Sequence, residues 1–217
     1  MSLFYKISRI CLSGLFKIAY SHEVIFPEGV VFPDGAIIAA NHASFLDPPL
    51  VAISWPEPIH FLARKTLFDS PLLRPLITTL NAHPLTGSSD ASSLKLACQL
   101  VNEGKKILIF PEGTRSLDGS LSPFKQGIGM LMRKSGAAII PTYIHGSYNA
   151  WPKNKKFPNL FRTKTACVFG KPIFLADFEE QDPKALQIAI ASGLHKEILA
   201  LQQQYCSRSS VDRADAS

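Results

Sequence analysis

Residues 36–49 read Ala36-Ile37-Ile38-Ala39-Ala40-Asn41-His42-Ala43-Ser44-Phe45-Leu46-Asp47-Pro48-Pro49. The first five are small or aliphatic, and such a continuous apolar run is typical of a strand that is buried on both faces of a sheet. The run stops at Asn41 and His42, and Asp47 follows the histidine by five residues, directly before two prolines. We therefore predict a strand that delivers His42 to a loop, followed by the start of a helix.

The spacing of His42 and Asp47 allows their side chains to meet in such a loop. On one continuous helix, residues five apart point about 140° away from each other, whereas a strand-to-helix turn reverses the chain between them. A carboxylate that accepts one imidazole N–H leaves the other ring nitrogen free to take a proton from a substrate hydroxyl. The alternative is that Asp47 only caps the helix, because aspartate before proline is a good N-cap.

A second polar block follows another apolar run and reads Phe110-Pro111-Glu112-Gly113-Thr114-Arg115-Ser116. If the two predicted strands are parallel, both blocks lie at one carboxyl edge of the sheet, where open α/β sheets bind ligands. Gly113 lets a ligand approach the backbone, and Arg115 offers a planar fork suited to phosphate. The alternative is a surface turn in which Glu112 only pairs with Arg115.

Together, in this order and about 65 residues apart, the two blocks resemble the glycerolipid acyltransferase family, which includes the 1-acylglycerol-3-phosphate acyltransferases. The first block matches the family at Asn41, His42 and Asp47, and the second matches over residues 110–116. Residues 61–68, 123–127 and 139–144 agree as well, so the resemblance covers roughly residues 24–170.

The resemblance implies an O-acyltransferase that moves a fatty acyl group from an acyl thioester to the free hydroxyl of 1-acylglycerol 3-phosphate, giving phosphatidic acid in phospholipid biosynthesis. His42 is then the expected catalytic base, Asp47 orients it, and Arg115 holds the acceptor phosphate. The expected substrate-binding residues are Glu112, Gly113, Thr114, Arg115, Arg64, Lys65 and Lys125. We expect no metal and no cofactor besides the co-substrate, which is acyl-CoA or an acylated acyl carrier protein.

One departure from the family keeps other acceptors open. The family's second block usually ends in an arginine, about where residues 81–87 of this chain contain none. The alternatives are a related acyltransferase that acts on glycerol 3-phosphate, another lysophospholipid or an amino-acyl lipid. A further alternative, from a different class, is a non-catalytic lipid-binding protein of the membrane surface.

Length and charge fit one domain with anionic partners. The 217 residues carry a net charge of +6, which favours phosphorylated substrates or acidic lipid headgroups. No nucleic-acid-binding motif is evident, so nucleic acid is not an expected partner. Repeated strand–helix–strand patterns predict a single α/β domain over residues 23–206, with a mixed, largely parallel central sheet flanked by helices.

Residues 1–22 predict a basic amphipathic helix. Charges interrupt every apolar run in it, so none reaches the roughly 20 residues that a spanning helix requires. We expect this helix to lie in the headgroup layer of a phospholipid membrane, making the protein peripheral or monotopic on the cytoplasmic side. The alternative is a terminal helix that packs on the protein's own core.

Two further segments carry predictions. Residues 151–157 form a basic aromatic loop that either touches lipid headgroups or is simply exposed. Residues 207–217 lack apolar periodicity and are predicted to be a disordered tail.

Overall fold

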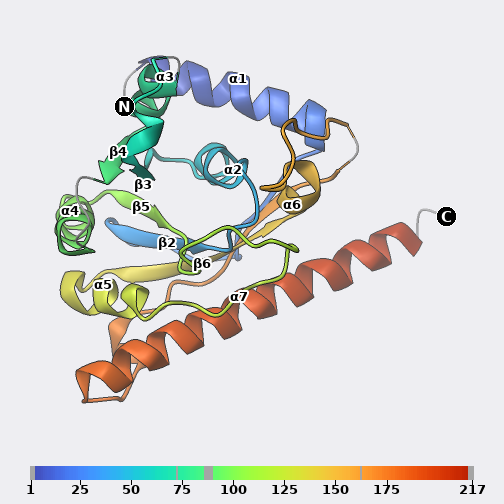
Figure 1. Ribbon diagram of the computed structural model, residues 1–217. Coiled ribbons are helices and arrows are strands. Elements are labelled where there is room, and N and C mark those ends of the chain that lie inside the picture. Colours follow the sequence, from blue (N-terminus) through green and yellow to red (C-terminus); the bar gives the residue numbers. More distant parts are fainter. Residues whose placement is uncertain (1–2, 72, 86–89, 162, 215–217) are drawn as a thin grey trace.

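A seven-stranded sheet forms the centre of the protein, in the order β1-β7-β6-β2-β5-β3-β4. The computed structural model describes residues 3–71, 73–85, 90–161 and 163–214 (Figure 1). All neighbouring strands are parallel except the antiparallel pair β6 and β7, which confirms the predicted mixed, largely parallel sheet. The strands are β1 (Glu23–Ile25), β2 (Ala36–Ala40), β3 (Ile59–Arg64), β4 (Ala82–Leu85), β5 (Lys106–Ile109), β6 (Ala138–His145) and β7 (Ala166–Phe169).

β2 lies in the middle of the sheet, between β6 and β5, and all five of its residues are buried. Successive side chains of a strand point to opposite faces. Ile37 and Ala39 accordingly belong to one hydrophobic core, and Ile38 and Ala40 to the other. The uninterrupted apolar sequence of this strand therefore reflects burial on both faces.

Helices cover both faces of the sheet, as Figure 1 shows. α1 (Leu3–Tyr20) and α2 (Asp47–Ser54) lie on one face, and α4 (Asp90–Asn102), α5 (Gly127–Ser135) and α7 (Pro183–Ala214) lie on the other. The shorter helices are η1 (Lys65–Leu67), α3 (Leu73–Thr79), α6 (Ser147–Ala150) and η2 (Leu175–Asp177). The result is the α/β sandwich of helix, sheet and helix layers that the alternating pattern predicted.

α1 combines a buried face with an exposed apolar one. Tyr5, Phe16 and Ala19 are buried beneath the helix, where Phe16 and Ala19 join the core formed with α2. Ile7, Ile10, Leu15 and Ile18 are largely exposed on its outer side. Among the described residues, no helix is both long and apolar enough to cross a bilayer.

The predicted disordered tail is wrong as far as Ala214, because α7 continues to that residue. Once a helix has been nucleated, each further residue adds a hydrogen bond, so the end of a long helix needs no apolar stripe of its own. Residues 215–217 lie outside the described part of the chain.

The segment between β3 and α4 also differs from prediction. Pro75 lies in the first turn of α3, where a missing N–H is tolerated. β4 was not predicted, and it contains Pro84. In the described part of the chain it is the last strand of the sheet and pairs with β3 alone, which is the position where a strand accepts proline.

Candidate active site

The end of β2 is fastened to β6 by the side chain of Asn41. Its Nδ2 donates to the Ile144 carbonyl at 3.1 Å, and its Oδ1 accepts from the Ile144 N–H at 2.7 Å. This amide continues the pairing of β2 with β6 one residue past the last backbone pair, Ala40 with Thr142. The main chain is therefore free to leave the sheet at His42 while its starting point stays fixed.

Asp47 receives three hydrogen bonds on one carboxylate oxygen. Its Oδ2 lies 2.8 Å from His42 Nδ1 and accepts the backbone N–H groups of Ala43 and Ser44, each at 2.7 Å. The carboxylate is fully buried, whereas the His42 side chain is 19% exposed. The residue before α2, Leu46, makes no side-chain cap. Asp47 therefore organises the loop and the imidazole rather than capping the helix.

This arrangement sets the tautomer of His42. A carboxylate accepts but does not donate, so Nδ1 carries the hydrogen and Nε2 is left as the basic nitrogen. The ring of Phe110, at the end of β5, stacks on the imidazole with 4.0 Å between centroids. His42 is thus held by a hydrogen bond on one nitrogen and by stacking on one face, with part of its surface open to a ligand.

Glu112 joins the second motif to the first. Its Oε1 accepts the backbone N–H of His42 at 2.6 Å, and its Oε2 accepts the N–H of Ser122 at 3.0 Å. In return, the Ser116 N–H donates to the His42 carbonyl at 2.7 Å. Burial raises the pKa of the Glu112 carboxyl, although the hydrogen bonds from His42 and Ser122 act in the opposite direction. Both backbone groups of His42 are therefore fixed by the loop that carries Arg115.

Arg115 lies against the loop of the first motif. Its guanidinium carbon is 3.7 Å from the centre of the Phe45 ring, which is a close cation–π contact. Phe45 stands between His42 and Asp47 in the sequence, so the stack places a fixed positive charge beside the imidazole loop. Such a planar cation suits the phosphate of an acceptor.

The backbone conformation favours glycine at position 113, and the Lys125 side chain lies against it. Its φ of +74° lies in the left-handed region, and a Cβ built there would come within 2.6 Å of Lys125 Nζ. The backbone N–H of Lys125 donates to Pro111 at 2.9 Å. Lys125 therefore lies across the second motif and adds a positive charge there.

The other predicted binding residues are less closely placed. Thr114 is exposed in the loop before Arg115. Arg64 ends β3, two strands from β2, and Lys65 is exposed in η1 directly after it. The backbone puts both at the same edge of the sheet as His42, and the side chain of Arg64 lies outside the described part of the structure.

The comparisons with known proteins identify the family. The family described as Acyltransferase matches residues 23–145, more than half of the sequence. The chain belongs to the acyltransferase family. This confirms the resemblance seen in the two motifs, both of which lie inside the matched region.

Several relatives carry the same enzyme name. A 1-acyl-sn-glycerol-3-phosphate acyltransferase of Bacillus subtilis is 26% identical over 203 residues, which cover 92% of this chain and 98% of that protein. One from Cocos nucifera is 31% identical, but the match covers 67% of this chain and 48% of that protein. The crystal structure of the 1-acyl-sn-glycerophosphate acyltransferase PlsC from Thermotoga maritima has 25% sequence identity and a TM-score of 0.63, covering 90% of this chain and 83% of that one.

Three supporting residues of this candidate site were missed by sequence reasoning. The Phe45 ring stacks on Arg115, the Ser122 N–H donates to Glu112, and the Tyr148 hydroxyl donates to the Leu117 carbonyl at 2.9 Å. Only Phe45 had a signal in the sequence, as an aromatic residue between the histidine and the aspartate. Ser122 and Tyr148 contribute through contacts that no local pattern encodes.

Proposed function

We propose that this acyltransferase acylates the free hydroxyl of 1-acylglycerol 3-phosphate and releases phosphatidic acid. The observation that carries the proposal is the His42–Asp47 pair with Nε2 left open and the Arg115 cation stacked on the same loop. The names of the relatives from Bacillus subtilis and Thermotoga maritima support this acceptor.

The reaction follows from the tautomer of His42. Nε2 removes the proton from the acceptor hydroxyl as its oxygen attacks the thioester carbonyl carbon. The carbon–sulfur bond then breaks, and the imidazolium returns the proton to the departing thiolate. The buried Asp47 carboxylate stabilises the imidazolium while it exists. General base catalysis of this kind typically contributes about 10²–10⁴-fold.

The acceptor is held by Arg115 of the second motif and by Lys125, which lies beside that motif. Arg115 binds the phosphate, a charge-assisted contact worth about 1.5–3 kcal/mol, and Lys125 adds a second charge. Neither motif contains a cysteine, and the attack is direct within one ternary complex. The acyl donor is acyl-CoA or an acylated acyl carrier protein, and no further cofactor takes part.

The protein works at a membrane surface, where the acceptor 1-acylglycerol 3-phosphate and the product phosphatidic acid reside. The exposed isoleucines and leucine of α1 would enter the headgroup layer, with Lys6 and Lys17 beside them facing anionic phosphates. This makes the enzyme peripheral or monotopic, on the cytoplasmic side. The exposed apolar face of α1, on a helix whose opposite side is already packed on the domain, supports this arrangement.

A panel of acceptors tests the proposal. Purified protein and one long-chain acyl-CoA are incubated with 1-acylglycerol 3-phosphate, glycerol 3-phosphate, other lysophospholipids and an amino-acyl lipid, and thiol release is followed. We expect 1-acylglycerol 3-phosphate to give the highest kcat/KM, and the His42→Ala protein to lose turnover while it still binds vesicles. Preference for another acceptor, or turnover that survives His42→Ala, contradicts the proposal.

A further inference from the structure

The loop between α6 and β7 is tied both to the catalytic loop and to the membrane-facing helix. Its residue Trp151 accepts a hydrogen bond from the Ser44 hydroxyl at 2.7 Å, inside the first motif. Farther along, the Phe161 N–H donates to the Ala19 carbonyl of α1 at 2.8 Å. Figure 1 shows this loop beside the C-terminal end of α1. We call its described residues 151–161 and 163–165 the α6–β7 loop.

The α6–β7 loop exposes large apolar side chains among lysines. Phe157 is 72% exposed, Leu160 49% and Phe161 71%. Lys153, Lys155 and Lys156 are exposed in the same loop. An aromatic ring that carries positive charge beside it suits the boundary between lipid headgroups and acyl chains.

Phe161 combines an exposed ring with an unfavourable backbone conformation. Its φ of +62° lies in the left-handed region, which a bulky residue rarely adopts. A glycine would take this conformation without strain. Since the ring is exposed, packing inside the protein does not account for a phenylalanine here.

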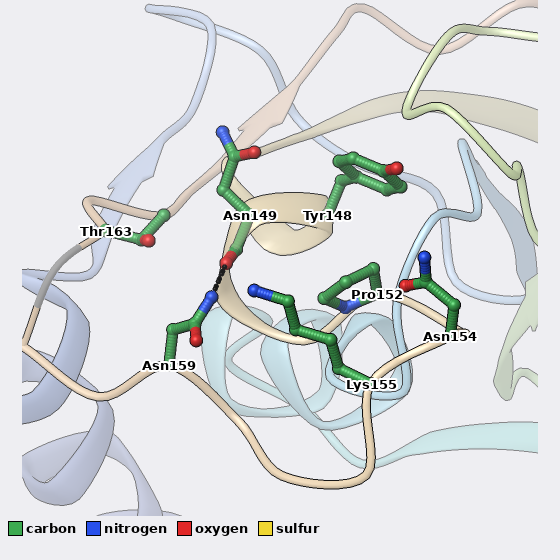
Figure 2. Close-up of a pocket in the computed structure, with 7 residues that line it drawn as sticks. All are labelled: Tyr148, Asn149, Pro152, Asn154, Lys155, Asn159 and Thr163. Atoms are coloured by element: carbon green, nitrogen blue, oxygen red, sulfur yellow. Dashed lines mark hydrogen bonds between the residues drawn. The ribbon is translucent and has the colours of Figure 1, made fainter.

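A polar pocket of about 400 Å³ lies under the same loop. Figure 2 shows its lining, with the Lys155 side chain extending toward Asn149 and Asn159. Nδ2 of Asn159 donates to the backbone carbonyl of Asn149 at 2.7 Å. The remaining lining residues are Tyr148, Pro152, Asn154 and Thr163. One ammonium among amides and a hydroxyl suits a phosphate group and the polar groups attached to it.

We propose that the α6–β7 loop is a second membrane-docking element, and that its pocket takes the headgroup phosphate of an anionic bilayer phospholipid. The aromatic side chains enter the interface next to the exposed end of α1, so helix and loop together hold the catalytic edge against the bilayer. This rests on the membrane attachment in the proposed function and adds a specific site to it. The lipid bound here is a component of the bilayer surface, distinct from the acceptor that Arg115 holds.

The apolar part of the site is tested by binding to vesicles of phosphatidylglycerol and phosphatidylcholine. Phe157→Ser should lower the partition coefficient about tenfold, because an interfacial ring is lost. Phe174→Ser is the matched control, because Phe174 is 48% exposed but lies far from the α6–β7 loop. It follows Ile173, which pairs with Ile139 at the start of β6, whereas the loop lies beyond the end of that strand. We expect that control to bind as the unaltered protein does. Equal partition coefficients for the two variants overturn the proposal.

Phe161→Gly separates docking from folding. The change removes the ring and relieves the backbone, so vesicle binding should weaken while the Tm stays the same or rises. Unaltered binding by this variant overturns the role of Phe161.

The pocket is tested by charge. Lys155→Gln should weaken binding about fivefold on vesicles that contain phosphatidylglycerol and leave binding to pure phosphatidylcholine unaltered. Lys171→Gln is the control, because Lys171 is an exposed lysine two residues after β7. An equal loss on neutral vesicles, or an equal effect of Lys171→Gln, overturns the headgroup assignment.

Turnover of a dispersed short-chain acceptor distinguishes this proposal from the proposed function. The loop variants should keep that activity, because none of them alters His42, Asp47 or Arg115. If the unaltered protein acylates no acceptor, the proposed function fails; if it does but the loop variants bind vesicles normally, only the docking site fails.

Discussion

Replacing Asp47 by asparagine separates the charge of this carboxylate from the hydrogen bonds that it accepts. Oδ2 takes all three bonds, from His42 Nδ1 and from the N–H groups of Ala43 and Ser44. Oδ1 is buried and has no hydrogen-bond partner among the described residues. An asparagine can therefore place its carbonyl oxygen where Oδ2 was and its amino group where Oδ1 was. The loop keeps its bonds, and the negative charge is lost.

The size of the effect follows from the charge on the imidazolium. Two unit charges about 4 Å apart interact by about 4 kcal/mol at an effective dielectric constant of about 20. Losing that interaction in the transition state corresponds to about a 10³-fold lower kcat, since about 1.4 kcal/mol is a factor of ten. The buried amino group costs about 1–3 kcal/mol of stability, offset by removal of a buried charge, so we expect the Tm to change little.

The assay is the initial rate of thiol release from a long-chain acyl-CoA with saturating 1-acylglycerol 3-phosphate. Asp47→Asn should lower kcat about 10³-fold and leave the acceptor KM almost unchanged, because Arg115 is not disturbed. In a His42→Ala background the same change should have no further effect, since Asp47 acts through the imidazole. A folded Asp47→Asn protein with nearly full kcat, or an equally large additional loss in the His42→Ala background, would refute this reasoning.

Three further changes give distinct results. Phe45→Leu removes the ring under Arg115, so steady-state kinetics should show an acceptor KM raised about 3- to 10-fold with a smaller change in kcat; an unchanged KM contradicts this. In Glu112→Gln, the single side-chain oxygen can accept from only one of the His42 and Ser122 N–H groups. Denaturant unfolding should therefore show a free energy of unfolding lowered by about 1–3 kcal/mol, less what is regained by removing a buried charge. Burial lowers the pKa of His22 to about 4, so the folded state holds it neutral. As the pH falls, His22 takes up a proton in the unfolded state before it does so in the folded state. The free energy of unfolding should therefore fall by about 2–3 kcal/mol as the pH drops from about 6.5 to 4. His22→Asn should remove this part of the pH dependence of the free energy of unfolding, whereas an unchanged pH dependence excludes His22 as its source.

The position of the His42–Asp47 pair could be predicted because it depends on local sequence. β2 is buried on both faces, so its apolar run ends abruptly where the chain leaves the sheet. The same holds for β5, whose run ends before Pro111. Two parallel neighbouring strands with polar ends place those ends together, and this alone brings His42 near the second motif.

The support around the pair could not be predicted, because it consists of long-range contacts. Asn41 bonds to Ile144, which is 103 residues away in the sequence, and Glu112 bonds to the backbone of His42 across 70 residues. Periodicity reports which face of an element is buried, but not which carboxylate meets which N–H group. The continuation of α7 was missed for a related reason, since a nucleated helix extends without a pattern of its own.

The missing arginine of the second family block can be weighed with the sheet order. β5 is next to β2, whereas β4 lies three strands away, which is about 14 Å at the usual strand spacing. Arg115 follows the neighbouring strand and is stacked on the His42 loop. It can therefore reach the phosphate of an acceptor whose free hydroxyl meets Nε2 of His42. A side chain at the end of β4 would have to reach across two intervening strands. An arginine on β4 would therefore contact only the margin of the site, and an acceptor in which glycerol carries both the phosphate and the free hydroxyl fits His42 and Arg115 without it.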